Sequence, residues 1–351
     1  MTDDTARRSL VSLTVVPGWV VFAAVTVLFA TGLTLPLRYQ FVPLVASVLV
    51  FGLPHGAVDH LAPTRVRGQP PTRRSLAAVG LLYAVVGGCY AVAWFLAPVA
   101  SFAVFILITW LHWGQGEVHS LLALLGVDHL ETPAQRALTA LARGTLPMLV
   151  PLVAFPGQYR LVAETLVGLF TSPTLGWADA AFTPRGRLVV GLVVVGLLGA
   201  SLVLGYHRAD RRRDWLVDAG EVGLLVAYFG LVPPVLAVGL YFTCWHALRH
   251  VGRLLAIDPA ARSRLADQEY GLALARFARD AAPLTAASLL FLAVFYWLVP
   301  VAPGTVSEWV GLYLVLIAAL TLPHVVVVFW LDREQQVWSS RPALLVERRR
   351  G

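Results

Sequence analysis

The sequence predicts an all-α protein, a polytopic bundle of about ten transmembrane helices with both termini in the cytoplasm. Of its 351 residues, 58% are apolar and 13% are charged, whereas soluble domains contain about 25% charged residues. Apolar runs of about 20 residues, enough to cross roughly 30 Å of hydrocarbon, recur along the chain. Segments rich in arginine alternate with segments that have almost none. We therefore expect one transmembrane helical domain over residues 1–351.

Ten segments are apolar and long enough to span a membrane. In chain order they are 17–35, 42–62, 76–97, 101–125, 137–155, 187–206, 216–231, 234–255, 281–299 and 309–331. Arg7 and Arg8 precede the first segment, which reaches spanning length without a cleavage motif, so it predicts a retained helix. Segment 156–186 is rich in Gly, Pro and Thr and predicts an extramembrane loop or interfacial insertion, with a short interfacial helix over 161–170.

Arginine supplies all of the basic charge, and the net charge is +7. The arginines cluster before the first span and after the second, fourth, sixth, eighth and tenth spans, where we place Arg136 and Arg143 after the fourth. The positive-inside rule then predicts a multi-pass protein of the cell membrane, surrounded by lipid bilayer. Because these arginines lie between apolar spans and no nucleic-acid-binding motif occurs, we do not expect nucleic acid as a partner. The two cysteines, Cys89 and Cys244, form no disulfide framework or CxxC site.

Most of the nine histidines lie within predicted spans rather than in loops. The seven in spans are His55, His60, His112, His119, His246, His250 and His324. Their four spans all run toward the cytoplasm, so the seven imidazoles are expected at similar depth. One imidazole in a membrane is readily explained by an interhelical hydrogen bond, but several at one depth favour a shared partner such as a metal ion. His129 and His207 are expected at the surface.

The spacing of these residues is also typical of a metal site. His246 and His250 are four residues apart, so one helical face would present both. Asp59 follows His55 by four residues, and a ligating histidine usually donates its other N–H to a carboxylate or carbonyl. Glu117, Asp218 and Glu221 are carboxylates at similar depth that could do the same. For Asp59 and Glu117, an ion pair with Arg249 is the alternative.

Aromatic residues adjoin the histidines in sequence. They are Trp110, Trp113, Tyr241, Phe242 and Trp245. They could line a tunnel for a long apolar substrate, and Trp245, next to His246, is the strongest single candidate. Ordinary core packing or an interfacial belt is the alternative for each of them.

Four short motifs, read together and in this order, resemble the Brp/Blh family of membrane β-carotene 15,15′-dioxygenases. They are GLPHGAVDH, LHWGQGE, WHALRH and LPH, and they extend from residue 52 to residue 324. The resemblance implies a non-haem iron dioxygenase that uses O₂ to cleave β-carotene at its central 15,15′ double bond. The products would be two retinals, which serve a microbial rhodopsin.

The resemblance also implies the ligands of an Fe(II) ion. These would be His55 in PHG, His112 in HWG, and His246 and His250 in WHALRH. Imidazole suits iron, copper and zinc alike, so the choice of iron follows from the oxidative reaction. Around the ligands we expect a second shell made of Asp59, His60, Glu117, His119 and His324. Glu117 stands where the family is expected to have Asp, and segment 156–186 is longer than the family pattern.

Other functions compete with this one. A multi-histidine membrane transporter would also place ionisable residues within the bilayer. A membrane di-iron oxidase or desaturase would need HxxHH runs, and the sequence has none. A bis-histidine cytochrome is disfavoured because His246 and His250 would lie on one helical face and could not grip a haem from opposite sides. The topology places the histidines in the cytoplasmic half of the bilayer and not at its midplane. If the protein is the dioxygenase, its long substrate must therefore enter sideways from the lipid through an apolar tunnel.

Overall fold

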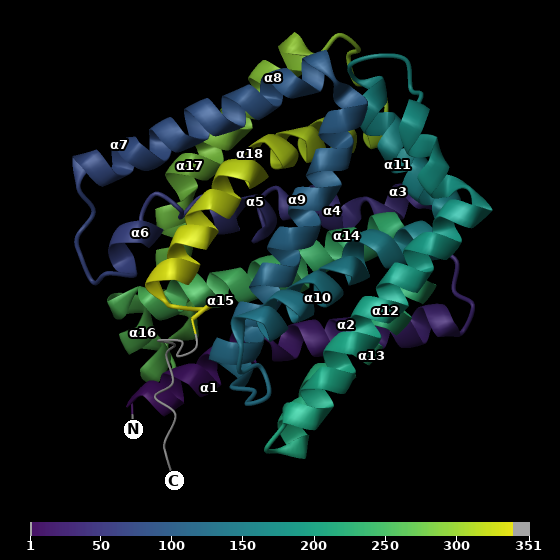
Figure 1. The fold of residues 1–351 in the computed structure, drawn as a ribbon. Helices are drawn as coiled ribbons and strands as arrows, with labels where there is room; N and C mark the ends of the chain where they lie inside the picture. Colours follow the sequence, from purple (N-terminus) through teal and green to yellow (C-terminus); the bar gives the residue numbers. More distant parts are fainter. Residues whose placement is uncertain (1, 340–351) are drawn as a thin grey trace.

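The computed structural model describes residues 2–339, and this part of the chain is helical with no β-strand (Figure 1). The predicted all-α fold class is confirmed. Eight helices are long and apolar enough to cross a membrane, judged by length and composition over the described residues. They are Thr5–Ala30, Leu37–Gly56, Arg73–Leu96, Pro98–Leu125, Pro133–Ala154, Pro184–Arg208, Tyr270–Leu298 and Val306–Glu334.

Each of the ten predicted spans coincides with helical structure. The remaining two spans are α13 (Arg212–Leu231) and the continuous helix made of α14 (Pro234–Leu240), η4 (Tyr241–Ala247) and α15 (Leu248–Ile257). These two are less apolar because they carry acidic, arginine and histidine side chains on buried faces. The first span begins earlier than predicted, since α1 (Thr2–Thr14) leads directly into α2 (Val16–Ala30).

The other long helices keep the predicted order, with short helices between them. The long ones are α7 (Arg73–Leu82), η1 (Tyr83–Gly87) and α8 (Gly88–Leu96) as one span, α9 (Pro98–His119) with η2 (Ser120–Leu125), α10 (Pro133–Ala154), α12 (Pro184–Arg208), α17 (Tyr270–Leu298) and α18 (Val306–Glu334). The short ones are α3 (Leu37–Gln40), α4 (Val42–Ser47), α5 (Gly52–Gly56), α6 (Ala62–Arg65) and α16 (Pro259–Ala266).

The second span, predicted as one helix over 42–62, is broken into separate helices. Between α4 and α5 the backbone turns at Phe51, whose φ of 57° is unusual for a residue with a Cβ. A Cβ at Gly52 would lie 2.5 Å from the Ser47 carbonyl oxygen, so the turn requires glycine there. The helix ends again at Gly56. Because of this break, the spacing of four residues between His55 and Asp59 does not place both side chains on one helical face, as a continuous helix would.

Segment 156–186 is not simply a loop. Its first half is α11 (Pro156–Gly168), which begins earlier than the helix predicted at 161–170. A 3₁₀ helix, η3 (Gly176–Phe182), follows. α11 packs against α9 and α18, where Ala163, Leu166 and Val167 are buried in an apolar cluster. The position of this segment relative to a bilayer stays a prediction.

Segments predicted to be cytoplasmic lie at one end of the bundle. Arg7 near the N-terminus donates to the carbonyl of Leu124 at the end of the α9–η2 span (3.1 Å). Arg65 after α5 pairs with Asp258 after α15 (3.3 Å). The same end holds α1 and the C-terminal end of α18 (Figure 1). This clustering agrees with the topology that the arginine pattern predicts.

Helices α9 and α10 approach each other backbone to backbone. A Cβ at Gly114 would lie 1.9 Å from the Ala140 carbonyl oxygen, and one at Gly144 would lie 2.1 Å from the Trp110 carbonyl oxygen. Only glycine permits this spacing at either crossing point. The close approach brings Arg143 of α10 next to the buried polar face of α9.

Candidate metal centre

Five buried histidines from five helical segments meet inside the bundle. They are His55 of α5, His112 of α9, His246 of η4, His250 of α15 and His324 of α18. Four of them are the ligands that the family resemblance implies. The fifth, His324, was expected only in the second shell.

The five imidazoles form a closed ring. Its ring centroids are separated by 4.8 Å from His246 to His112, 4.8 Å from His112 to His324, 5.1 Å from His324 to His250, 5.5 Å from His250 to His55, and 5.5 Å from His55 to His246. His55 and His324 also face each other across the ring at 5.1 Å. Such close packing of imidazoles from distant parts of the chain is typical of side chains that share a ligand.

Several imidazole nitrogens of this cluster are buried without a hydrogen-bond partner. Within the described residues, this holds for the Nε2 atoms of His112, His246, His250 and His324. An unsatisfied buried polar atom costs about 1–3 kcal/mol, so native structures rarely leave several together. A metal ion accepts lone pairs from several imidazoles at once. The residues present therefore fit a metal bound among them.

Hydrogen bonds fix the orientation of two of these rings. His55 Nδ1–H donates to the Gly52 carbonyl, which leaves its Nε2 as the free lone pair. The Asp59 carboxylate lies 2.7 Å from His324 Nδ1 and also accepts a hydrogen bond from the Tyr83 hydroxyl (2.6 Å). Asp59 thus holds an imidazole by its Nδ1 atom, as carboxylates beside metal-binding histidines usually do, but the imidazole belongs to His324 on another helix.

The helix that carries His246 and His250 is locally wound as a π-helix over Tyr241–Ala247. π-helical turns are rare and are found frequently at functional sites. A second π turn, η1, lines the same region with Tyr83 and Gly87. The wider turns change which side chains face the histidine ring.

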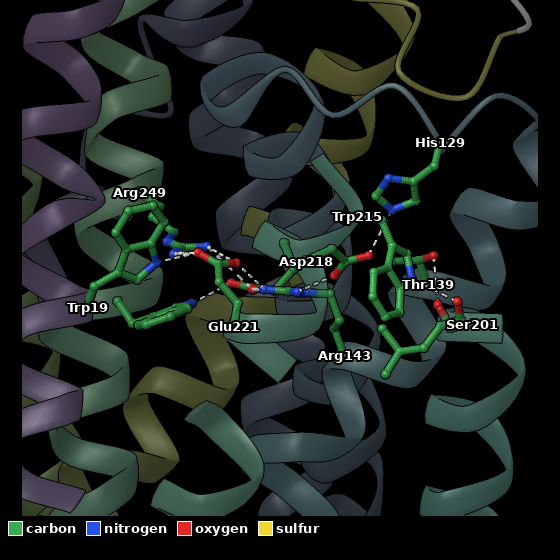
Figure 2. Close-up of polar contacts among 12 residues, drawn as sticks. Trp19, His129, Thr139, Arg143, Ser201, Trp215, Asp218, Glu221 and Arg249 are labelled. Atoms are coloured by element: carbon green, nitrogen blue, oxygen red, sulfur yellow. Dashed lines mark hydrogen bonds and ion pairs between the residues drawn. The ribbon is translucent and has the colours of Figure 1, made fainter. Parts of the chain in front are cut away.

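A buried ionic network of arginines and carboxylates lies inside the bundle (Figure 2). Its members Glu117 and Arg249 line one small void together with His246 and His250 of the ring. Arg143 pairs with Glu117 (2.5 Å), Asp218 (2.7 Å) and Glu221 (2.5 Å). Arg249 pairs with Glu221 (2.5 Å) and Glu117 (3.5 Å). The ion-pair alternative therefore holds for Glu117, while Asp59 contacts Tyr83 and His324 instead. Removing one partner of such a network costs about 3–5 kcal/mol, because the remaining charge is left buried.

One residue predicted to lie at the surface and one predicted to lie in a loop belong to this network. His129 is fully buried, and its Nε2 lies 2.9 Å from Asp218. Arg143 is also buried in α10 and is not a loop residue. Both predictions were wrong. A signal for Arg143 was present in the sequence, because position 143 falls inside the predicted span 137–155.

The remaining second-shell candidates lie near the ring with different surroundings. His60 is half-buried, and its Nδ1–H donates to the Ala57 carbonyl (3.0 Å). His119 is buried beside His246 and His250 at a small void that Arg249 also lines.

A cavity of about 820 Å³ opens beside the ring and is lined mainly by apolar side chains. His55, His112, His246 and His324 form part of its wall. Its volume is within the range of roughly 300–1,000 Å³ that small-molecule sites occupy. On α18 the lining residues run from Ser307 to His324, a rise of about 25 Å at 1.5 Å per residue. The cavity is therefore long as well as wide.

The same cavity reaches the apolar outer surface of the bundle. Leu76 and Gly80 of α7 line it, as do Pro283 and Ala287 of α17, and all four residues are exposed. An opening between α7 and α17 would face lipid if the long apolar helices cross a membrane.

Two of the five predicted tunnel aromatics line this cavity, Trp113 and Phe242. The other three lie elsewhere. Trp245 Nε1 donates to Glu117 (2.8 Å), and the Tyr241 hydroxyl donates to the same carboxylate (3.4 Å). Trp110 Nε1 donates to the Leu141 carbonyl (2.7 Å). These three side chains support the ionic network and the α9–α10 contact.

Fold and site together define a class of protein, a polytopic helical bundle with a buried histidine centre at the wall of an apolar cavity. Comparison with known proteins narrows this class. A family model described as beta-carotene 15,15′-dioxygenase matches residues 46–332, and the chain belongs to this family of enzymes.

Curated relatives agree with the family match. The chain is 47% identical over 334 residues to "Probable beta-carotene 15,15′-dioxygenase Blh" of Halobacterium salinarum, which covers 95% of this chain and 96% of that protein. It is 33% identical over 330 residues to "Probable beta-carotene 15,15′-dioxygenase Brp" of the same species, covering 90% of each. "Beta-carotene 15,15′-dioxygenase" of an uncultured marine bacterium is 22% identical over 208 residues, 58% of this chain and 66% of that protein. No solved structure matches the chain significantly.

Proposed function

We propose that this enzyme cleaves β-carotene at its 15,15′ double bond with O₂, giving two retinals, and that it uses Fe(II). The observation that carries the proposal is a ring of imidazoles at the wall of a long apolar cavity. A polyene hydrocarbon offers no polar group for recognition, so an apolar cavity of this size suits it. In the reaction one oxygen atom is added to each carbon of the broken double bond.

Iron is the metal that suits both the donors and the reaction. Imidazole and carboxylate groups are suitable ligands for iron. Zinc is redox-inactive and could not activate O₂. When bound, Fe(II) supplies the binding and activation of O₂. A divalent ion among neutral imidazoles needs negative charge nearby in low dielectric, and Asp59 supplies a buried carboxylate beside His324.

The chain's own residues position the substrate and exclude water. Residues of α18 from Ser307 to His324 line the cavity, and so do residues of α7 and α17. We expect a polyene that lies along α18 and extends between α7 and α17 to present an interior double bond to the ring. Apolar walls such as Phe105 and Phe242 keep water from the reacting carbons.

A transporter or a membrane di-iron oxidase remains the alternative class. A transporter would need a polar path to the aqueous side, and the large cavity is instead mainly apolar. A di-iron enzyme would bind two metal ions per chain. Metal analysis of the purified protein separates these functions: we expect one iron per chain and no haem absorbance.

The reaction is tested by expression in a bacterial host that accumulates β-carotene. We expect loss of the carotenoid colour and formation of two retinals per β-carotene, measured by chromatography. The variant His207→Ala, at an exposed position, serves as an active control. Unchanged β-carotene with no retinal, despite iron-loaded protein in the membrane fraction, would contradict this substrate. We expect the retinal to supply a microbial rhodopsin in the native cell.

The location proposed for the protein is the cell membrane, crossed several times with both termini in the cytoplasm. Reporter fusions at Gly68 and Ala260 are expected to report cytoplasmic, and one at Ala302 external. The ion pair between Arg65 and Asp258 supports a common side for the first two sites. A Gly68 fusion that reports an external position would overturn this topology.

A further inference from the structure

His324 packs against the other imidazoles of the histidine ring at least as closely as do the four histidines that the family resemblance assigns to iron. It lies on α18 directly after Pro323, and it is 5% exposed. Its ring is 4.8 Å from His112, 5.1 Å from His55 and 5.1 Å from His250. Within the ring, only His55 has as many imidazole neighbours.

The positions of the potential ligand atoms also place His324 at the metal site. Two groups of residues in the described chain bring potential ligand atoms within 4.8 Å of one another. One consists of His55, His112 and His324, and the other of Asp59, His250 and His324. His324 is the residue common to both groups. A metal close to His55 and His112 would therefore lie close to a donor atom of His324.

The surroundings of His324 hold its ring in one orientation. Its Nδ1 lies 2.7 Å from the Asp59 carboxylate, which is itself fixed by the Tyr83 hydroxyl. Asp59 is completely buried. The Nε2 atom of His324 is also buried and has no hydrogen-bond partner among the described residues. A carboxylate that holds one imidazole nitrogen and leaves the other free is the arrangement that ligating histidines usually show.

We propose that His324 is a fifth imidazole ligand of the metal, and that Asp59 is the residue that positions it. This inference rests on the proposed function, since it requires a metal in the histidine ring. It changes the expected centre from four imidazoles on three helical spans to five imidazoles on four. It also makes α18, which carries one long wall of the cavity, part of the metal site.

The test measures metal binding directly. Purified protein in detergent, freed of metal with a chelator, is titrated anaerobically with Fe(II) and separately with Co(II), whose visible spectrum reports its ligands. We expect His324→Ala to lower affinity by about 100-fold or more and to change the Co(II) spectrum, because loss of a second-shell partner alone costs about 10–100-fold. Asp59→Asn should lower affinity within that smaller range. His207→Ala is the matched control and should bind as wild type.

A double-mutant cycle separates ligation from general support of the fold. If Asp59 acts through His324, Asp59→Asn should cost little further affinity in a His324→Ala background. His324→Gln keeps most of the side-chain volume, and thermal unfolding of each variant checks that it folds. Folded His324→Ala or His324→Gln with wild-type affinity and spectrum would overturn the inference, as would fully additive losses in the cycle.

The failure of this inference can be told apart from failure of the proposed function. Wild-type protein that binds neither metal and forms no retinal would remove both. Wild-type protein that binds metal and forms retinal, together with unchanged metal binding in folded His324→Ala, would remove only the fifth ligand.

Discussion

Alanine in place of His55, His112, His246 or His250 is expected to abolish retinal formation and to lower iron content in each case. Each imidazole contributes to one closed ring of donors, with neighbouring centroids 4.8–5.5 Å apart. Losing one opens a gap in the ring and loosens the placement of the remaining donors. Iron per chain is measured by elemental analysis, and retinal by chromatography from a β-carotene-producing host.

His129→Ala provides the contrast that separates metal binding from folding. His129 is fully buried and pairs with Asp218 in the ionic network, and it is not one of the five histidines of the ring. Its loss leaves a buried carboxylate with one partner fewer, which costs about 1–3 kcal/mol of stability. We expect a lower melting temperature with unchanged iron per folded chain. His246→Ala that retained both iron and turnover would show that the four-histidine assignment is wrong.

The helical fold and the gathering of histidines were predictable because both depend on patterns local to the sequence. Spanning helices follow from apolar runs of sufficient length, and their direction follows from the arginines at their ends. Together these placed His55, His112, His246 and His250 at one depth, where the structure brings their rings together.

Partners of individual side chains were harder to predict because they depend on packing between helices. The turn at Phe51 and the helix end at Gly56 direct Asp59 toward α18 rather than along its own helix. Similarly, Arg143 is drawn into the bundle because glycines allow α9 and α10 to touch. No pattern along the chain encodes which carboxylate meets which cation.

For Tyr241 and Trp245, the prediction of a place in the tunnel wall was wrong for a related reason. A regular α-helix turns by about 100° per residue. Over Tyr241–Ala247 the chain is π-helical, with wider turns, so that spacing does not apply. Phe242 faces the cavity, while Trp245 faces Glu117. A local change of helix type thus decided which aromatic side chain reaches the substrate space.

Entry of the substrate from the side of the bundle predicts that blocking the opening between α7 and α17 strongly lowers retinal formation. β-Carotene is about as long as the hydrocarbon core is thick, roughly 30 Å. On α18 the residues that line the cavity begin at Ser307 and end at His324, a rise of about 25 Å. A polyene lying only along α18 would therefore bring one of its ends, and not its central bond, to the histidines. Central cleavage therefore requires an oblique polyene that reaches out between α7 and α17.

Gly80→Trp should obstruct that opening. Gly80 lies on α7 at the cavity wall, and a Cβ added there meets no atom of the described chain within 4 Å. The helix itself should tolerate the change, since glycine is the poorer helix former by a few tenths of a kcal/mol or more. We expect retinal formation to fall by about ten-fold or more, equivalent to about 1.4 kcal/mol, with iron content unchanged. Initial rates in detergent-solubilised membranes at fixed β-carotene measure the effect.

Gly223→Trp is the matched control for this experiment. Gly223 is also an exposed helical glycine with open space around its Cβ, but it lies on α13 and does not line the cavity. It should retain the wild-type rate. A second variant, Leu314→Trp, instead narrows the cavity at its α18 wall, and should favour shorter apocarotenoids over β-carotene. Equal rates for wild type, Gly80→Trp and Gly223→Trp would exclude entry between α7 and α17. If Gly80→Trp lost iron together with activity, the loss of activity would come from the metal centre and not from blocked substrate access.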